Sequence, residues 1–306
     1  QRDVPLQVVY PVRAGRYPLV VASHGAGGNR SSFSYQAADL ASHGYVVVSV
    51  EHVFSNNVRL KRLFREGSGW PRERTRSALV AMVSDPRAVL ERPRDVSFAI
   101  DRATAWTAEH PQLGGRIDVS KVAVMGHSFG AYTTLAAIGA RPILDHLRPA
   151  VAPGEGLAED LSDPRVTAGI AFSPQGPGTS RFSKASYATI DRPLLCLSGS
   201  MDDQLGHDGE TQPAKVRLEI LDLMPPGEKL LAWLENADHL AFTDNDQAWM
   251  LPSPARDDAQ RLSKRLTLAF CDLHLKGDAR AKQRLNARYA NTLCGEVVTQ
   301  VTWFER

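Results

Sequence analysis

Short apolar runs that are continuous rather than alternating constrain the fold of this chain most strongly. A strand with one face in solvent alternates apolar and polar residues, whereas a strand covered on both faces is apolar throughout. Six such runs occur, each bounded by Gly, Pro or polar residues, at 18–23, 45–51, 121–126, 166–173, 193–199 and 229–235. The pattern predicts a central, mostly parallel sheet that is buried on both faces.

Segments with a helical period separate these runs. They lie at 31–43, 94–110, 129–140, 212–223 and 255–275. Strands that alternate with helices are typical of a doubly wound α/β sheet flanked by helices. An early run at 4–10 alternates and precedes Pro11, which predicts an edge strand, and the chain is expected to return as a terminal strand at 297–304. We interpret residues 1–306 as a single domain.

Two stretches depart from the alternation. Residues 57–95 carry ten Lys or Arg against five Asp or Glu, and residues 141–164 carry six Pro and Gly. Long excursions from a sheet either lie on the surface as solvated insertions or form lids over a site. Both stretches are therefore candidates for a surface insertion or a partial cap.

Charge and composition exclude several classes of function. The 36 basic and 34 acidic residues leave a formal charge of +2, which provides no electrostatic basis for binding nucleic acid. No apolar run approaches the ~18–20 residues of a membrane helix. The chain also has no His-Glu-x-x-His motif and no Cys/His cluster, so we expect neither a metal ion nor a cofactor.

The sharpest motif is Gly126-His127-Ser128-Phe129-Gly130. It follows the apolar run at 121–126 and precedes the helical segment at 129–140. A G-x-S-x-G sequence between a strand and a helix forms a nucleophile elbow, a strained turn that exposes the serine hydroxyl. Ser128 is therefore the candidate nucleophile.

A serine hydroxyl needs a base to remove its proton and a carboxylate to orient that base. After such an elbow in the sequence, the acid comes first and the His second, each following a later strand. Asp202 and Asp203 follow the run at 193–199, and His239 follows the run at 229–235. His239 is therefore the predicted base. His207 is the weaker candidate, since it lies in a polar loop.

The attack of a serine on a carbonyl group produces an oxyanion, which needs hydrogen-bond donors. One is the N–H of the residue after the serine, here Phe129, and the other comes from the loop after an early strand. That loop is the glycine-rich segment 24–28, in which the N–H of Ala26 is our choice. A phosphate cradle is the competing interpretation, but Arg30 stands where the last glycine of G-x-G-x-x-G belongs.

These residues resemble the α/β-hydrolase superfamily, and within it the branch of platelet-activating-factor acetylhydrolases and bacterial predicted dienelactone hydrolases. The resemblance rests on SHGAGGNRSSF (23–33), LASHGYVVVSVEH (40–52), RPRDVSFAIDRA (92–103), GHSFGAYTTL (126–135), GSMDD (199–203), ADH (237–239) and FCDLHLKGDARA (270–281). The true dienelactone hydrolases use cysteine where this chain has Ser128. Bacterial cutinase-like polyester hydrolases are similar at a greater distance, and they usually have an aromatic residue at the position of Ala26.

The resemblance implies a serine esterase that acts on small or short-acyl esters. It favours Asp202 over Asp203 as the acid, because Asp202 stands three residues after Gly199 as in the resembled esterases. Amide cleavage, acyl transfer and polyester or phospholipid-type ester hydrolysis use the same residues and stay open, as does a silent binding module. Candidate walls of the substrate pocket are Phe33, Trp70, Phe172 and Phe242.

The cysteines and the first residue bear on the compartment. Cys196 lies in an apolar run and is expected to be a small buried hydrophobic residue. Cys271 and Cys294 flank a polar stretch and would pair in an oxidising compartment. The chain begins at Gln1 rather than Met, and together with the resemblance this favours an exported, periplasmic or secreted, bacterial protein. The sequence does not indicate an oligomeric state.

Overall fold

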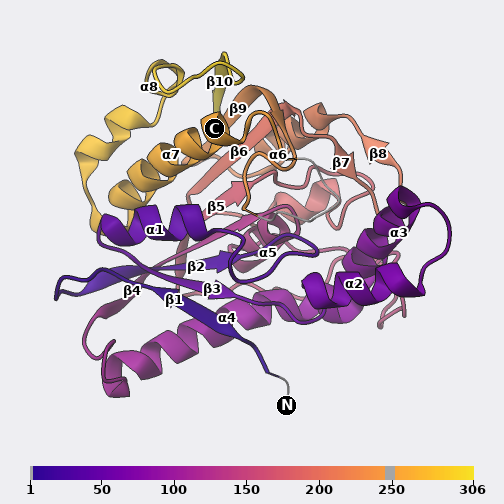
Figure 1. The fold of residues 1–306 in the computed structure, drawn as a ribbon, viewed down its shortest axis with the longest axis horizontal. Helices are drawn as coiled ribbons and strands as arrows, with labels where there is room; N and C mark the ends of the chain where they lie inside the picture. Colours follow the sequence, from indigo (N-terminus) through magenta and orange to yellow (C-terminus); the bar gives the residue numbers. More distant parts are fainter. Residues whose placement is uncertain (1–2, 245–251) are drawn as a thin grey trace.

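Eight strands form one central sheet in the order β1-β3-β2-β4-β5-β6-β9-β10 (Figure 1). The computed structural model describes residues 3–244 and 252–306. The strands are β1 (Leu6–Val9), β2 (Tyr17–Ser23), β3 (Val46–Val50), β4 (Ile117–His127), β5 (Val166–Phe172), β6 (Leu194–Met201), β9 (Lys229–Asp238) and β10 (Val301–Glu305). Each of the six continuous apolar runs forms a strand of this sheet.

The six inner strands run parallel to their neighbours. The outer strands β1 and β10 pair antiparallel with β3 and β9. The inner strands are almost wholly buried, as continuous apolarity predicts. Because parallel strands end at the same edge of a sheet, the loops after β2, β4, β5, β6 and β9 meet there. The predicted doubly wound, mostly parallel sheet is confirmed.

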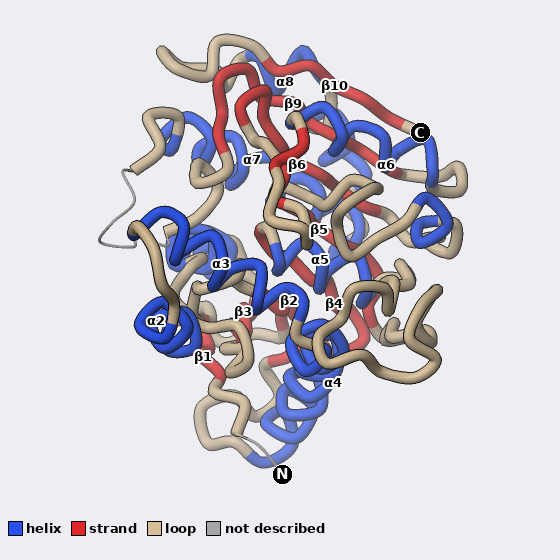
Figure 2. Tube along the Cα trace, turned by 90° about the vertical axis from the view of Figure 1, so that its right-hand side faces the viewer, coloured by secondary structure: helices blue, strands red, loops and turns tan. Residues whose placement is uncertain are grey.

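Helices cover both faces of the sheet (Figure 2). On one face lie α1 (Ser34–Ser42) and α7 (Arg256–Lys276), whose side chains, such as Leu40 and Leu266, share one apolar cluster with the sheet. On the other face lie α4 (Pro86–Glu109) and α5 (Phe129–Ala137), which contribute to a second cluster. The central strands are therefore buried between two helical layers.

The stretch 57–95 is largely helical. It contains α2 (Asn57–Glu66), α3 (Pro71–Ser84) and the first turns of α4. Helices α2 and α3 lie side by side beyond the ends of the central strands (Figures 1 and 2). The smaller elements are η1 (Lys184–Tyr187), β7 (Gln204–Leu205), β8 (Thr211–Gln212), η2 (Ala214–Glu219), α6 (Ile220–Leu223), η3 (Ala279–Arg284) and α8 (Ala287–Asn291).

Helix α4 begins earlier than the sequence predicts. The helical period predicted a start at residue 94, and Pro93, which has no backbone N–H, would usually interrupt a helix. In the structure the helix runs through Pro93 from Pro86. The missing N–H would have bonded to the carbonyl of Val89, and the hydroxyl of Tyr132 donates to that oxygen at 3.0 Å instead. A tertiary hydrogen bond thus replaces the one that proline removes.

The segment 212–223 is not one regular helix. It begins with β8, continues as the 3₁₀ helix η2 and ends in the four residues of α6. The ring of Pro213 disfavours the helical conformation of the residue before it, so Gln212 stays extended in β8 and does not begin a helix. The prediction of a single helix was wrong here.

All three cysteines are free thiols in the structure, which contradicts the expected pairing of Cys271 with Cys294. Cys271 is 1% exposed and packs in the apolar cluster of α7. The thiol of Cys294 instead lies 3.8 Å from Oδ1 of Asn291, beside α8. The two side chains therefore face different neighbours. Cys196 is buried as expected, and burial raises the pKa of its thiol.

The two longest helices carry too many charges to be membrane spans. Helix α4 has 24 residues and α7 has 21, and both have Asp and Arg distributed along their length. Within residues 3–244 and 252–306, no helix is both long and apolar enough to cross a lipid bilayer.

Candidate active site

Ser128 occupies a strained turn between β4 and α5. Its backbone has φ 55° and ψ −117°, a left-handed conformation that costs a residue with a side chain about 1–3 kcal/mol. Its N–H donates to the carbonyl of Phe172 at 2.9 Å. A side chain at Gly126 would overlap the backbone of Gly130, and one at Gly130 would overlap the carbonyl of Ser23. The two glycines of the motif thus permit the close approach that holds the turn.

Ser128, His239 and Asp202 form a hydrogen-bonded chain. Nε2 of His239 lies 2.8 Å from Oγ of Ser128, and its Nδ1 lies 2.7 Å from Oδ1 of Asp202. The three residues follow β4, β9 and β6, so the shared edge of the parallel sheet brings them together. Such a chain can transfer the serine proton to the imidazole while the carboxylate fixes the tautomer of the ring.

Asp202 is wholly buried and ionised. Burial opposes its charge, but the Arg217 guanidinium and His239 outweigh this effect and lower the pKa of Asp202 to about 2. Oδ2 of Asp202 also accepts a hydrogen bond from the hydroxyl of Ser198 at 2.7 Å. Both carboxylate oxygens therefore have partners, which fixes the orientation of the group.

Asp203, the alternative acid, lies close by but faces a different group. Its side chain is exposed, and Oδ1 accepts a hydrogen bond from the N–H of Ala214 at the start of η2. The two adjacent carboxylates thus point in different directions. Only Asp202 hydrogen-bonds to His239.

Arg217 holds the loop that carries Asp202 and Asp203, and no motif in the sequence points to this residue. The side chain is 1% exposed. Its Nε donates to the carbonyl of Asp202 at 2.8 Å, its Nη1 donates to the carbonyls of Ser173 and Pro174, and its Nη2 donates to that of Asp203. Nη2 also lies 3.1 Å from Oδ1 of Asp202. The only signal in the sequence is an arginine between two apolar neighbours, which is too common to identify such a role.

His127 supports the backbone of His239. It lies inside the G-x-S-x-G motif, and its Nε2 is 2.7 Å from the carbonyl oxygen of His239. The ring is 4% exposed. Burial, together with His239, lowers the pKa of His127 to about 3. The ring is therefore neutral at ordinary pH and donates its Nε2 proton to that carbonyl.

Titration of His127 makes stability depend on pH. The unfolded chain binds a proton near pH 6.5, whereas the folded chain resists it down to about pH 3. Stability therefore falls as the pH drops through this window, by about 1.4 kcal/mol per pH unit for one proton. A glutamine keeps a donor for the His239 carbonyl but does not titrate, so we expect His127→Gln to reduce this slope by about one proton. Urea unfolding of both proteins between pH 4 and 7 measures the slopes, and equal slopes would contradict the assignment.

The two predicted oxyanion donors lie beside Ser128. Phe129 and Ala26 both line the cavity over the elbow. In the part of the chain that the structure describes, neither backbone N–H donates a hydrogen bond. Two free amides next to a serine hydroxyl can stabilise a negative charge that develops on a substrate oxygen.

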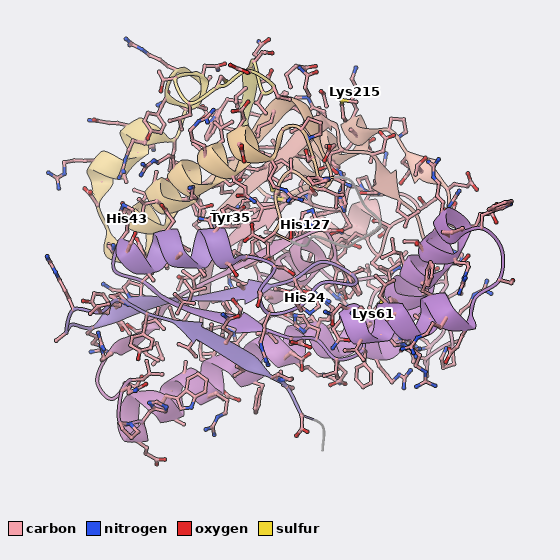
Figure 3. All side chains as sticks on the ribbon, viewed as in Figure 1. His24, Tyr35, His43, Lys61, His127 and Lys215 are labelled. Carbon is pink, nitrogen blue, oxygen red and sulfur yellow. The ribbon has the colours of Figure 1, made fainter. Side chains whose placement is uncertain are left out.

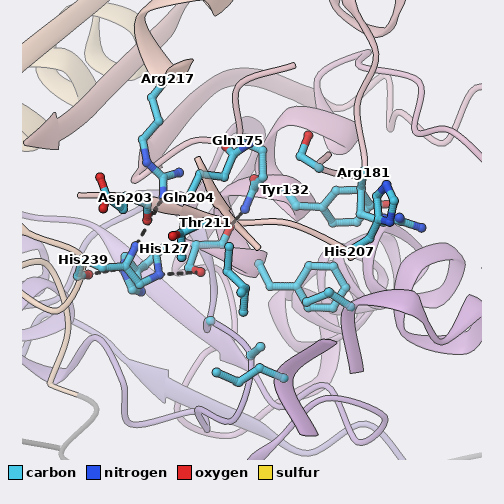
Figure 4. Close-up of a pocket in the computed structure, with 18 of the residues that line it drawn as sticks. His127, Tyr132, Gln175, Arg181, Asp203, Gln204, His207, Thr211, Arg217 and His239 are labelled. Carbon is cyan, nitrogen blue, oxygen red and sulfur yellow. Dashed lines mark hydrogen bonds between the residues drawn. The ribbon is translucent and has the colours of Figure 1, made fainter. Parts of the chain in front are cut away.

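The cavity over Ser128 has a volume of about 240 Å³ (Figure 4). Its largely apolar wall is built by side chains of α3, of α5 and of the segment after β6. These are Thr75, Leu79, Val83, Phe129, Tyr132 and Leu205. Helix α3 belongs to the stretch 57–95, so part of this stretch lines the cavity.

The four aromatic side chains that were predicted to line the pocket lie elsewhere, which corrects that prediction. Phe33, Phe172 and Phe242 are at most 2% exposed and pack with one another in the cluster under α1 and α7. Trp70 is 76% exposed at the start of α3. Phe33 directly precedes α1, Phe172 is the last residue of β5 and Phe242 follows β9. All three belong to the apolar cluster on the α1 and α7 face of the sheet, which the sequence did not reveal.

His207 lines the same cavity but lies away from Ser128. In Figure 4 it lies on the opposite side of the cavity from His239. Its ring stacks on that of His146, with centroids 4.0 Å apart. Through this contact the stretch 141–164 reaches the rim near His207, although none of its residues is among those that line the cavity.

Acidic, histidine and cysteine side chains do not gather as metal ligands near Ser128. In the ranges 3–244 and 252–306, no group of three or more such residues is arranged to hold a metal ion. Ser128, His239 and Asp202 are instead hydrogen-bonded to one another.

Comparison with known proteins relates the chain to two groups of hydrolases. A family model described as platelet-activating factor acetylhydrolase, isoform II, matches residues 4–59 and 99–152. The platelet-activating factor acetylhydrolase of Cavia porcellus is 25% identical over 221 residues, which cover 65% of this chain and 50% of the relative. That of Canis lupus familiaris is 30% identical over 149 residues, covering 42% and 33%. Cutinase est1 of Thermobifida alba is 28% identical over 137 residues, covering 45% and 36%.

These matches support the fold and the branch. The chain spans half or less of the length of these relatives. The family model covers the loop of Ala26 and the elbow of Ser128, but not Asp202 or His239. With its mostly parallel sheet flanked by helices, the chain has the α/β-hydrolase fold and resembles the platelet-activating factor acetylhydrolase branch, with the cutinases as more distant relatives.

Proposed function

From this resemblance and the geometry of the site, we propose that the protein is a serine-dependent carboxylic ester hydrolase. The observation that carries the proposal is the hydrogen-bonded chain of Ser128, His239 and Asp202 beside the free amides of Ala26 and Phe129. A binding module would need no such chain. The relatives whose names describe acetylhydrolases and cutinases support the same class of reaction.

The first half of the reaction acylates the serine. Oγ of Ser128 attacks the ester carbonyl carbon while its proton moves to Nε2 of His239. The carbonyl electrons move to the substrate oxygen, which the N–H groups of Ala26 and Phe129 stabilise. His239 then gives its proton to the departing alcohol, and an acyl-Ser128 remains.

The second half uses water in place of the alcohol. His239 removes a proton from water, the resulting hydroxide attacks the acyl carbon, and the same amides stabilise the second oxyanion. The proton then returns to Ser128 as the acid leaves. Asp202, held ionised by Arg217, holds the ring of His239 in the required tautomer and stabilises its positive charge in each transition state.

We propose small or short-acyl esters as substrates. The cavity of about 240 Å³ has little room for a long chain, and Leu79 and Val83 of α3 narrow it. Among the relatives, the name acetylhydrolase describes removal of a two-carbon acyl group. We also propose that α3 acts as part of a cap that limits the length of the acyl group.

A series of p-nitrophenyl esters tests both the activity and the size limit. We expect kcat/KM to be highest for acetate or butyrate and to fall at least tenfold by octanoate, because the wall at Leu79 blocks longer chains. Leu79→Ala removes part of that wall and should raise the octanoate-to-acetate ratio several-fold.

Leu63→Ala is the matched control. Leu63 packs against the same small cluster of α2 and α3 as Leu79 but does not line the cavity. Its variant should keep the wild-type ratio. A wild-type protein that hydrolyses none of the esters would contradict the proposed activity, and equal ratios in all three proteins would contradict only the size limit.

From the resemblance, we propose that the protein is exported from the cytoplasm to the periplasm or the medium. Fractionation of the native host into cytoplasm, periplasm and medium tests it, with the protein expected outside the cytoplasm.

A further inference from the structure

The direction of each oxyanion-hole N–H follows from the carbonyl of the same peptide unit. A trans peptide is planar, so its C=O points opposite to its N–H. The N–H of Phe129 shares a peptide unit with the carbonyl of Ser128, and the N–H of Ala26 shares one with the carbonyl of Gly25. A side chain that holds either carbonyl therefore aims the opposing N–H at the substrate.

Gln175 contacts the first of these carbonyls, which also accepts the N–H of Tyr132 at 3.0 Å. Its Nε2 donates to the carbonyl oxygen of Ser128 at 2.8 Å. Because a carbonyl only accepts, the amide must present its nitrogen to Ser128. The residue lies just beyond β5, where the hydroxyl of Tyr187 donates to its backbone carbonyl at 2.7 Å. Gln175 also lines the cavity.

His24 contacts the second carbonyl, which also accepts the N–H of Gly28 at 3.1 Å. It is 1% exposed and lies in the interior of the molecule (Figure 3). Its Nδ1 lies 2.7 Å from the carbonyl oxygen of Gly25, and the backbone N–H of His52 donates to its Nε2 at 3.0 Å. Nε2 therefore carries no proton, and Nδ1 must carry the one that it donates. Burial, with Arg92 and His52 nearby, lowers the pKa of His24 well below its usual value and keeps the ring neutral.

A buried chain of polar groups fixes the backbone around His24. Nη2 of Arg92 donates to the carbonyl of His24 and, at 3.0 Å, to the hydroxyl of Ser23. That hydroxyl lies 2.9 Å from Nε2 of His52, whose Nδ1 lies 2.8 Å from Oδ2 of Asp95. These groups repeat the order Ser, His, Asp, but they are at most 3% exposed. An inaccessible serine that already accepts from arginine is a structural hydroxyl rather than a second nucleophile.

We propose that Gln175 and His24 are positioning residues of the oxyanion hole, each aiming one backbone N–H through the carbonyl of the same peptide unit. The inference rests on the proposed ester hydrolysis. It assigns a role to two side chains that touch neither Ser128 Oγ nor His239. Misaiming a donor costs less than removing one, which reduces kcat about 10²–10³-fold.

The variants separate aiming from folding. Gln175→Ala and His24→Leu remove the donors, and we expect kcat to fall about 10- to 100-fold with KM changed less than threefold. His24→Asn places an amide nitrogen near the position of Nδ1 and should recover most of the lost activity. Gln175→Glu has a donor only when its carboxyl is protonated, so its activity relative to wild type should rise as the pH falls.

Inhibition by a transition-state mimic is a measurement that a purely structural role of Gln175 and His24 would leave unchanged. The serine adds to the carbonyl of an alkyl trifluoromethyl ketone, forming a C–O bond while the carbonyl electrons become an alkoxide and His239 accepts the proton. The alkoxide occupies the oxyanion hole. The inhibition constant of the ketone should therefore rise as kcat falls in Gln175→Ala and His24→Leu. In His24→Asn it should return toward the wild-type value.

Gln260→Ala is the matched control, since Gln260 is a half-buried glutamine on α7 whose Nε2 donates to Asp244 at 3.0 Å, away from the cavity. It should stay within twofold of wild type. If the wild type is inactive, the proposed function itself fails. The positioning role is overturned if the wild type is active but the Gln175 and His24 variants match Gln260→Ala. It is also overturned if these variants differ from the wild type only in KM. Should His24→Leu not fold by circular dichroism, the Gln175 variants and His24→Asn decide.

Discussion

Replacing Ser128 with alanine is expected to abolish ester hydrolysis, lowering kcat by about 10⁵–10⁶-fold, since removal of a triad serine in a protease costs about that much. The loss follows because no acyl-enzyme can form and Nε2 of His239 loses the Ser128 hydroxyl that it contacts. Initial rates with p-nitrophenyl acetate measure the effect. The wild type should also react with one equivalent of phenylmethylsulfonyl fluoride, and mass spectrometry should place the adduct on Ser128.

Ser263→Ala serves as the control for this substitution. Ser263 is a buried serine of α7, and we expect the variant to keep wild-type activity and labelling. An adduct on any serine other than Ser128, or substantial hydrolysis by Ser128→Ala, would overturn the assignment of the nucleophile.

Replacing Asp202 with asparagine is expected to lower kcat by about 10⁴-fold, as the corresponding change does in the serine proteases. The neutral amide cannot stabilise the positive charge that His239 acquires, and it can present its NH₂ group to Nδ1 and so favour the wrong tautomer. It would also leave the buried Arg217 without its ion-pair partner. Circular dichroism and thermal unfolding establish that the variant is folded before its kcat is compared.

Asp203→Asn is the matched control, because the neighbouring carboxylate is exposed and accepts a hydrogen bond from the Ala214 N–H. An asparagine oxygen can accept the same bond, so kcat should change by less than about tenfold. Near-normal activity in Asp202→Asn together with an inactive Asp203→Asn would transfer the acid role to Asp203.

The local features of the site could be predicted because the backbone itself requires them. The strained turn at Ser128 needs Gly126 and Gly130, because side chains there would overlap the neighbouring backbone. This requirement appears in the sequence as two glycines at a fixed spacing around the serine. Ser128, Asp202 and His239 each follow a parallel strand, and they meet because these strands end at one edge of the sheet. Such signals lie within a few residues of each other or in the order of strands, so a single sequence displays them.

The walls of the cavity could not be predicted in the same way. Phe33 and Phe242 lie near the motifs in sequence and Phe172 ends β5, but all three pack in the apolar cluster under α1 and α7. Leu79 instead reaches the cavity from a helix that has no motif. Which side chain reaches a cavity depends on how helices pack across the ends of the strands. The pairing of Cys271 with Cys294 could not be decided from the sequence either. The packing of α7 and α8 sets the neighbours of the two thiols, and both are free.

The sequence by itself determined the doubly wound sheet, the elbow at Ser128 and the loops that carry Asp202, His239 and Ala26, because apolar periodicity and glycine spacing act locally along the chain. Only the tertiary structure decided which aspartate faces His239, that Arg217 holds it ionised, and that Gln175 and His24 hold the peptide units of the two free amides. The contacts of His239, Arg217 and Gln175 join residues that are far apart in the chain. His24 is next to Gly25 in the sequence, but the backbone N–H of His52, beyond β3, fixes its ring. Hydrogen bonds of 2.7–3.1 Å between such distant residues depend on the folded geometry of the whole sheet, and no local pattern encodes them.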